Sequence, residues 1–113
     1  MSDCVFCRII REDEPATFVA HWEYTVAIVP LKPVVQGHIL VLPRRHVADF
    51  AESPHDSAEA MRMAASLARE MGPCNLITSK GREATQLVFH LHLHIVPRTA
   101  GDGIALPWTE ATP

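Results

Sequence analysis

The fold of this chain is decided by the stretch Phe89-His90-Leu91-His92-Leu93-His94-Ile95-Val96-Pro97-Arg98. Apolar residues and histidines alternate in it with the period of two that is typical of a β-strand. The alternation predicts that three apolar side chains face the core: Leu91, Leu93 and Ile95. It places three imidazoles on the opposite face: His90, His92 and His94. Because buried imidazoles need polar partners, the stretch predicts a strand whose second face lines a polar pocket.

Three uses of these histidines are open. The first is a solvent-exposed face that happens to be rich in histidine, which strict alternation of three disfavours. The second is one metal ion held by all three. Residues i and i+4 of a strand lie about 13 Å apart and zinc–nitrogen bonds are about 2 Å long, so a strand can offer two of them to one ion but not three. The third use divides the roles, with one histidine binding metal, one reacting and one supporting.

The pattern on either side of this strand predicts an α+β domain on a mainly antiparallel sheet of about five strands, with one long helix and a short N-terminal helix. Apolar spacing predicts the long helix behind Ser53-Pro54, ending at Gly72-Pro73, and Asp3 is a candidate N-cap for the short one. The expected elements are a helix over Cys4–Arg11 and strands over Thr17–Ala20, Tyr24–Val29, His38–Leu42, Asn75–Ser79 and Leu87–Val96. Residues 1–98 form the expected domain, and residues 99–113 an extended tail anchored by Trp108.

Composition limits the function classes. The chain has 113 residues, a net charge of −3 and 7 histidines, as many as its 4 Phe, 2 Trp and 1 Tyr together. Histidine is suited to proton transfer, metal ligation and nucleophilic attack on phosphorus. No Lys/Arg block extends beyond Arg44-Arg45, so the charge pattern excludes a broad surface for duplex nucleic acid or an anionic membrane. The apolar runs are too short for a membrane span and no secretory leader is seen, which predicts a cytoplasmic protein.

The three cysteines include a Cys4-x-x-Cys7 pair. In a reducing compartment such a pair more often binds metal or works in redox chemistry than forms a disulfide. Apolar packing or a labile thiol pair are the alternatives. Cys74 has no nearby partner in the sequence and is expected to be a core thiol.

Three motifs in this order resemble the histidine-triad (HIT) superfamily: the Cys4-x-x-Cys7 pair, Gly37-His38-Ile39-Leu40-Val41-Leu42-Pro43, and Gln86 followed by the histidine strand through His94. The resemblance runs from Cys4 to Arg98. It implies the HIT-like fold and an enzyme that hydrolyses or transfers nucleotides. Its expected substrates are a nucleoside phosphoramidate or a dinucleoside polyphosphate.

The resemblance also implies roles for particular residues. His92 would be the nucleophile that attacks the α-phosphate and forms a covalent nucleotidyl-histidine intermediate. His94 and His38 would flank the phosphate, and Gln86 would hydrogen-bond the phosphate or the leaving group. Ser79, where the family often has Asn, would contact substrate together with His90.

A zinc site is implied as well. In similar HIT proteins the metal is held by the two cysteines, a histidine after the strand-and-proline segment and the first histidine of the triad. In this chain those positions are Cys4, Cys7, His46 and His90. Four protein ligands make a closed, structural zinc site that would fix the N-terminal helix beside the histidine strand.

The chain departs from the family pattern where many members hold the ribose. The acidic residue often found before the Gly-His loop corresponds to about Pro30, and no carboxylate lies between Glu23 and Asp49. The glycines that usually precede the glutamine are replaced by Ala84 and Thr85, and a small hydroxyl residue after it by Leu87. Phosphate chemistry therefore looks intact while ribose recognition does not.

Two functions from different classes follow. The first is a HIT enzyme that uses His92, acting as a homodimer joined through the sheets and the long helix. The expected dimer face of that helix is Met61, Ala64, Ala65 and Ala68. The second is a zinc-stabilised nucleotide-binding or interaction module with little or no turnover. The intact histidines favour the first, and the missing carboxylate favours the second.

Overall fold

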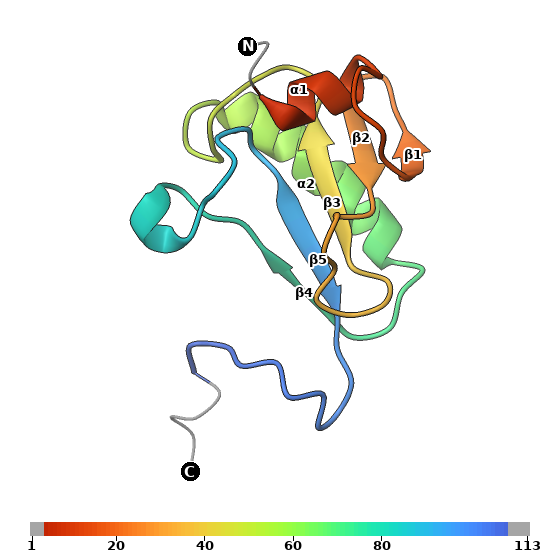
Figure 1. Cartoon of the computed structure of the whole chain (residues 1–113). Coiled ribbons are helices and arrows are strands. Elements are labelled where there is room, and N and C mark those ends of the chain that lie inside the picture. The colour runs from red at the N-terminus through yellow and green to blue at the C-terminus, as the bar shows by residue number, and fades with distance from the viewer. Residues whose placement is uncertain (1–3, 109–113) are drawn as a thin grey trace.

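The computed structural model describes residues 4–108, and residues 1–3 and 109–113 lie outside the description (Figure 1). Its centre is a five-stranded sheet in the order β1-β2-β3-β5-β4, in which every neighbouring pair is antiparallel. The strands are β1 (Phe18–His21), β2 (Thr25–Ile28), β3 (Ile39–Pro43), β4 (Cys74–Ile77) and β5 (Leu93–Pro97). The expected α+β class, the number of strands and their orientation are confirmed.

Helices cover both faces of this sheet. The long helix α2 (Pro54–Ala68) lies behind it in Figure 1, where the fully buried Ala60 and Ala64 allow close packing on the strands. The short helix α1 (Val5–Ile10) packs Phe6 and Ile9 on the other face, and a short 3-10 helix η1 (Arg82–Ala84) follows β4. Because side chains alternate along β2, its Ala27 faces α2 while Val26 and Ile28 face α1. In Figure 1, α1 covers only the upper part of its face of the sheet, and the part below α1 is left for a site.

Capping explains where the helices begin. Ser53 accepts a hydrogen bond from the Asp56 N–H and precedes Pro54, which is a favourable start for α2. The N-cap of α1 is Cys4, whose Sγ accepts from the Cys7 N–H, rather than the expected Asp3. Asp3 itself lies outside the described residues.

The histidine strand is shorter than predicted, and this is a correction. β5 begins at Leu93, not at Leu87, so His90 and His92 precede the ladder. Val41 pairs with Leu93, which would bring Pro43 opposite Leu91, and proline has no N–H to continue the ladder. The Leu91 N–H bonds to the Val47 carbonyl instead, at 2.7 Å. The apolar face was predicted correctly, since Leu91, Leu93 and Ile95 are all buried.

Two further expectations are wrong. Trp108 is 63% exposed and does not anchor the tail. Ala64 is buried in the core, so it cannot belong to an exposed dimer face, although Met61 and Ala65 are exposed.

The boundary between a domain ending at residue 98 and a tail from residue 99 stays a prediction. Within residues 4–108, no helix is both long and apolar enough to cross a membrane.

Candidate active site and metal centre

Four side chains from three separate parts of the chain meet beside α1. One ligand atom from each of Cys4, Cys7, His46 and His90 lies within 4.8 Å of all the others. The distances from Sγ of Cys7 to Nδ1 of His46 and of His90 are 3.3 and 3.6 Å, and Sγ of Cys4 lies 3.5 Å from Nδ1 of His90. We call this group the metal cluster.

The metal cluster fits a zinc ion. Zinc–sulfur bonds of about 2.3 Å and zinc–nitrogen bonds of about 2.0 Å at a tetrahedral angle put S and N about 3.5 Å apart, which is the spacing found here. His90 Nε2 donates to the Pro43 carbonyl at 2.8 Å, so Nδ1 is left without a proton, as a metal ligand requires. Burial raises the pKa of the Cys7 thiol, and a bound cation would reverse that shift. The four residues predicted as ligands are therefore brought together with suitable chemistry.

His92 lies two residues after His90, which belongs to the metal cluster. Its Nδ1 lies 2.7 Å from the His90 carbonyl, an atom that can only accept, so Nδ1 carries the proton. Nε2 then holds a free lone pair and has no partner within residues 4–108. The ring packs edge-on against Phe6, with centroids 5.0 Å apart. Burial lowers the pKa of His92, which favours the neutral imidazole.

His38 and His94 form a second, connected pair. The Val34 N–H donates to His38 Nδ1 at 3.0 Å, so the proton of neutral His38 sits on Nε2. That Nε2–H donates to His94 Nδ1 at 3.0 Å, which in turn puts the proton of His94 on its own Nε2. Burial, followed by the proximity of His92 and His38, lowers the pKa of His94 to about 4. His94 is thus a neutral N–H donor next to the His92 ring, at 5.0 Å between centroids.

The loop that delivers His38 depends on a glycine. Gly37 has φ of +92°, and a Cβ at this position would lie 3.2 Å from the Pro97 side chain. Only glycine combines this backbone conformation with so close an approach. The Gly37-His38 motif therefore marks a steric requirement of the site.

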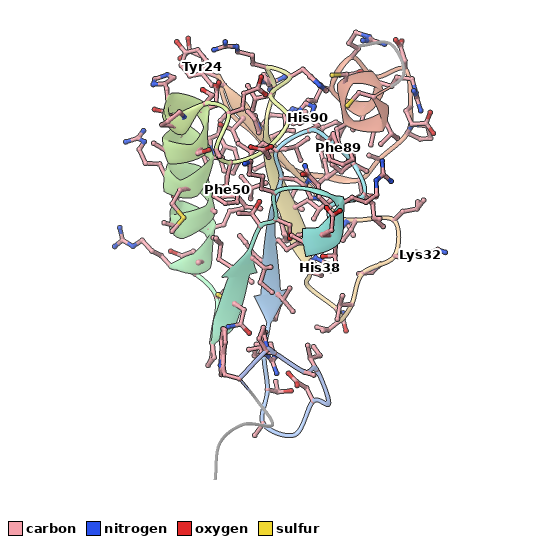
Figure 2. All side chains as sticks on the ribbon, turned by 90° about the vertical axis from the view of Figure 1, so that its left-hand side faces the viewer. Tyr24, Lys32, His38, Phe50, Phe89 and His90 are labelled. Carbon is pink, nitrogen blue, oxygen red and sulfur yellow. The ribbon has the colours of Figure 1, made fainter. Side chains whose placement is uncertain are left out.

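A cavity of about 350 Å³ opens on this face of the sheet. Figure 2 shows His38 on this face, below His90 and α1. His38, His92 and His94 line the cavity together with Ser79 and Gln86, so five of the predicted site residues share it. His90 does not line it, because its ring is turned into the metal cluster. The remaining lining residues are Pro30, Lys32, Val34, Asn75, Ile77, Thr85, Val96, Arg98, Ile104, Ala105 and Leu106.

Gln86 is 3% exposed, and both ends of its amide are hydrogen-bonded to the backbone. Its Oε1 accepts from the Gly81 N–H at 2.8 Å, and its Nε2 donates to the carbonyls of Ala48 and Val88 at 2.7 and 3.1 Å. In this arrangement the side chain fixes the loop after η1 to the rest of the site. A direct contact between Gln86 and phosphate stays a prediction.

Sequence reasoning missed two contributors. The Thr78 hydroxyl donates to the His92 carbonyl at 2.8 Å and so holds the backbone of His92, and nothing in the sequence distinguishes this threonine. Arg98 makes a two-pronged pair with Asp102, at 2.8 and 3.0 Å, and also donates to Asn75 and to the Ile104 carbonyl. This clamp brings residues 104–106 to the cavity wall. The four-residue spacing of Arg98 and Asp102 was the available signal.

Comparison with known proteins agrees with this geometry. A family model described as "HIT domain" matches residues 11–101. An uncharacterised HIT-like protein of Methanocaldococcus jannaschii is 34% identical over 113 residues, covering 95% of this chain and 88% of that protein. An adenosine 5′-monophosphoramidase of Schizosaccharomyces pombe is 31% identical over 109 residues, covering 93% of this chain and 82% of the relative.

Among solved structures, a zinc-bound histidine triad family protein from Mycobacterium smegmatis superposes with a TM-score of 0.80 at 35% identity. The alignment covers 92% of this chain and 81% of that one. The resemblance noted in the sequence motifs is confirmed by the match of sequence and fold over most of the chain. The chain belongs to the HIT domain family.

Proposed function

We propose that this chain is a nucleotide hydrolase or nucleotidyl transferase in which His92 attacks the α-phosphate of a nucleoside phosphoramidate or a dinucleoside polyphosphate. The observation that carries the proposal is the hydrogen bond from His92 Nδ1–H to the His90 carbonyl. It fixes the tautomer in which Nε2 is a neutral nucleophile, and His92 lines the cavity. The phosphoramidase named among the relatives supports the reaction class.

In the first step Nε2 of His92 forms a bond to the α-phosphorus, and the bond from phosphorus to the leaving group breaks. The leaving group departs with its electron pair and takes a proton from solvent. The imidazole gains positive charge as the new bond forms, which strengthens the Nδ1–H bond to the His90 carbonyl. This hydrogen bond is therefore stronger in the transition state than in the ground state, and it lowers the barrier of the first step.

In the second step water attacks phosphorus, the bond to Nε2 breaks and one proton of the water goes to solvent. The products are a nucleoside monophosphate and free His92, and an alcohol or amine in place of water gives transfer. The Nε2–H of His94 is a donor for a non-bridging oxygen in both steps. The Val34 N–H holds that tautomer through His38, so the donor is oriented before substrate binds.

The test compares wild type with His92→Asn, which keeps a polar group near the position of Nδ1 but removes Nε2. Release of nucleoside monophosphate is measured from an adenosine phosphoramidate, a guanosine phosphoramidate and a diadenosine polyphosphate. We expect the variant to lose at least about three orders of magnitude in kcat. His55→Asn, at an exposed histidine of α2, is the matched control and should retain full activity. Turnover that survives in His92→Asn would refute the mechanism.

A nucleotide-binding module with negligible turnover is the second candidate. It is favoured by the Gln86 amide, which is occupied by the backbone, and by the lack of a carboxylate among the cavity-lining residues. Under this alternative, folded wild type binds nucleotide but releases no monophosphate from any member of the panel. His92→Asn would then bind as tightly as wild type.

Zinc and a second copy of the chain complete the proposal. A zinc ion would be held in a closed site by Cys4, Cys7, His46 and His90, where its role is to fix α1 and the His90 backbone.

We propose a homodimer formed through α2 and the edge strand β4, whose Leu76 and Ile77 are part-exposed. Light scattering after size exclusion should give twice the chain mass, and Leu76→Arg should reduce it to the single-chain value.

A further inference from the structure

The residues that line the cavity include cations but no carboxylate. None of the residues that line it is an aspartate or a glutamate, and two of them, Lys32 and Arg98, are cations. Arg98 is neutralised by the paired hydrogen bonds to Asp102. Among the described residues, Lys32 has no hydrogen bond or ion pair. Lys32 is therefore the one uncompensated charge among the described residues that line the cavity.

The position of Lys32 suits an approaching ligand. Figure 2 shows it on the loop between β2 and β3, the loop that delivers His38, with its side chain directed outward from the sheet. Lys32 is exposed to solvent and is at the same time one of the cavity-lining residues. Pro30, two residues earlier, also lines the cavity and has neither an N–H nor a side-chain acceptor to offer a hydroxyl group.

The chemistry of ribose recognition gives this pattern a meaning. A carboxylate accepts hydrogen bonds from a free ribose diol, whereas a nearby cation accommodates a phosphate ester on the same oxygens. This wall offers no carboxylate and one free cation. A plain diol would find no charged acceptor among the cavity-lining residues, and a phosphorylated sugar would find an opposite charge.

We propose that the cavity selects nucleotides that carry a phosphate ester on the 2′- or 3′-oxygen of the sugar, with Lys32 as the specificity-determining residue. The inference rests on the proposed nucleotide chemistry of His92, because it places the α-phosphate at His92 and the sugar toward the cavity mouth. It adds a substrate class that the histidines alone do not define.

Binding of three ligands to the full chain tests the proposal without turnover: adenosine 5′-monophosphate, adenosine 2′,5′-bisphosphate and adenosine 3′,5′-bisphosphate. Titration calorimetry at low salt should show at least one bisphosphate binding about tenfold more tightly than the monophosphate, as expected for one charge-assisted contact. The preference should shrink as salt is raised. The two regioisomers show which oxygen carries the phosphate. Equal or weaker binding of both bisphosphates would overturn the proposal.

Variants separate a specific contact from net charge. Lys32→Gln should abolish the preference, while Arg69→Gln removes the same charge at an exposed position of the α2 C-cap and should leave it intact. An equal loss in both variants would show a general charge effect and overturn the assignment. Pro30→Asp combined with Lys32→Gln should invert the preference in favour of the diol.

Turnover of the corresponding phosphoramidates distinguishes the two levels of the argument. His92-dependent release without discrimination by Lys32 defeats this inference and leaves the proposed function standing. A Lys32-dependent binding preference without His92-dependent release defeats the enzyme and favours the binding module. Failure of all three nucleotides to bind, together with no release from the phosphoramidates, defeats both.

Discussion

At the scale of single residues, His94 is one of the cavity histidines whose protonation couples the stability of the fold to pH. The groups that face it are His38, which donates to its Nδ1, and His92. Because its pKa of about 4 in the folded chain lies below the ordinary 6.5, the unfolded chain binds a proton that the folded chain does not. The resulting stabilisation is complete above pH 6.5 and is lost as the pH falls from there toward 4.

We therefore predict that the free energy of unfolding falls between pH 6.5 and 5, and that His94→Gln makes this fall shallower. One proton is worth at most about 1.4 kcal/mol per pH unit, and partial exposure of His94 reduces that value. Urea unfolding at several pH values measures the slope. His55→Gln, at an exposed site, should leave the slope as in wild type, and a slope unaltered by His94→Gln would contradict the prediction.

Thr85 is a strained residue on the cavity wall. It has φ of +73°, a left-handed conformation that is costly for a β-branched side chain. Thr85→Gly should raise stability by roughly 0.5–1 kcal/mol, because relief of strain exceeds the added freedom of the unfolded chain. Urea midpoints provide the measurement. Glu12→Gly, at φ of +66° and without a branched Cβ, should gain less, and a larger gain there would contradict this account.

The residue types in the site were predictable, but their hydrogen bonds were not. His38, His92 and His94 share a cavity as the motifs indicate, and the four predicted metal ligands meet. The tautomers depend on backbone groups of Val34 and His90, and no sequence pattern reveals which main-chain atoms face a ring. The same holds for Gln86, which bonds to the nearby Gly81 N–H and Val88 carbonyl and to the carbonyl of Ala48, 38 positions earlier in the chain.

At the scale of elements, every predicted helix and strand has a counterpart in the structure, and the largest error is the start of β5. Alternation describes an extended backbone, but it does not say whether a neighbouring strand continues beside it. Here Pro43 ends the ladder, and side chains replace strand partners around His90 and His92. The break frees the His90 carbonyl for the His92 ring.

The segment after β5 is held by the Arg98–Asp102 clamp, in which Asp102 also accepts from the N–H groups of Thr99 and Ile104. These bonds, the arginine first, hold the pKa of Asp102 well below its usual range. Asp102→Asn should loosen residues 99–106 and open the cavity wall. Hydrogen exchange of these amides should rise, while Asp13→Asn, which removes an exposed pair with Arg11, should not change them. Unchanged exchange in Asp102→Asn would show that other contacts hold the segment.

At the scale of the whole molecule, the metal cluster connects α1 to the start of the histidine segment, although Cys7 and His90 are 83 positions apart in the chain. A small domain gains much of its stability from such a link. We predict one zinc per chain, and its loss together with a lower Tm in Cys4→Ser. Serine keeps the N-cap of α1, so the change isolates the metal from the cap.

Cys74→Ser is the matched control, because Cys74 is a free cysteine outside the metal cluster. It should retain the metal, as measured by elemental analysis, and keep the Tm response to chelator. Full zinc content in Cys4→Ser would show that the other three ligands suffice. Absence of zinc from carefully prepared wild type would refute the site.

The hydrogen bond that orients His92 ends on a main-chain oxygen, and this has an evolutionary consequence. Every amino acid at position 90 supplies the same carbonyl, whereas only a few supply an imidazole for metal. Mutation can therefore remove the ligand without deleting the acceptor. Descendants of this gene can lose the imidazole at position 90 and, where packing holds the backbone, still inherit the acceptor that orients the His92 ring.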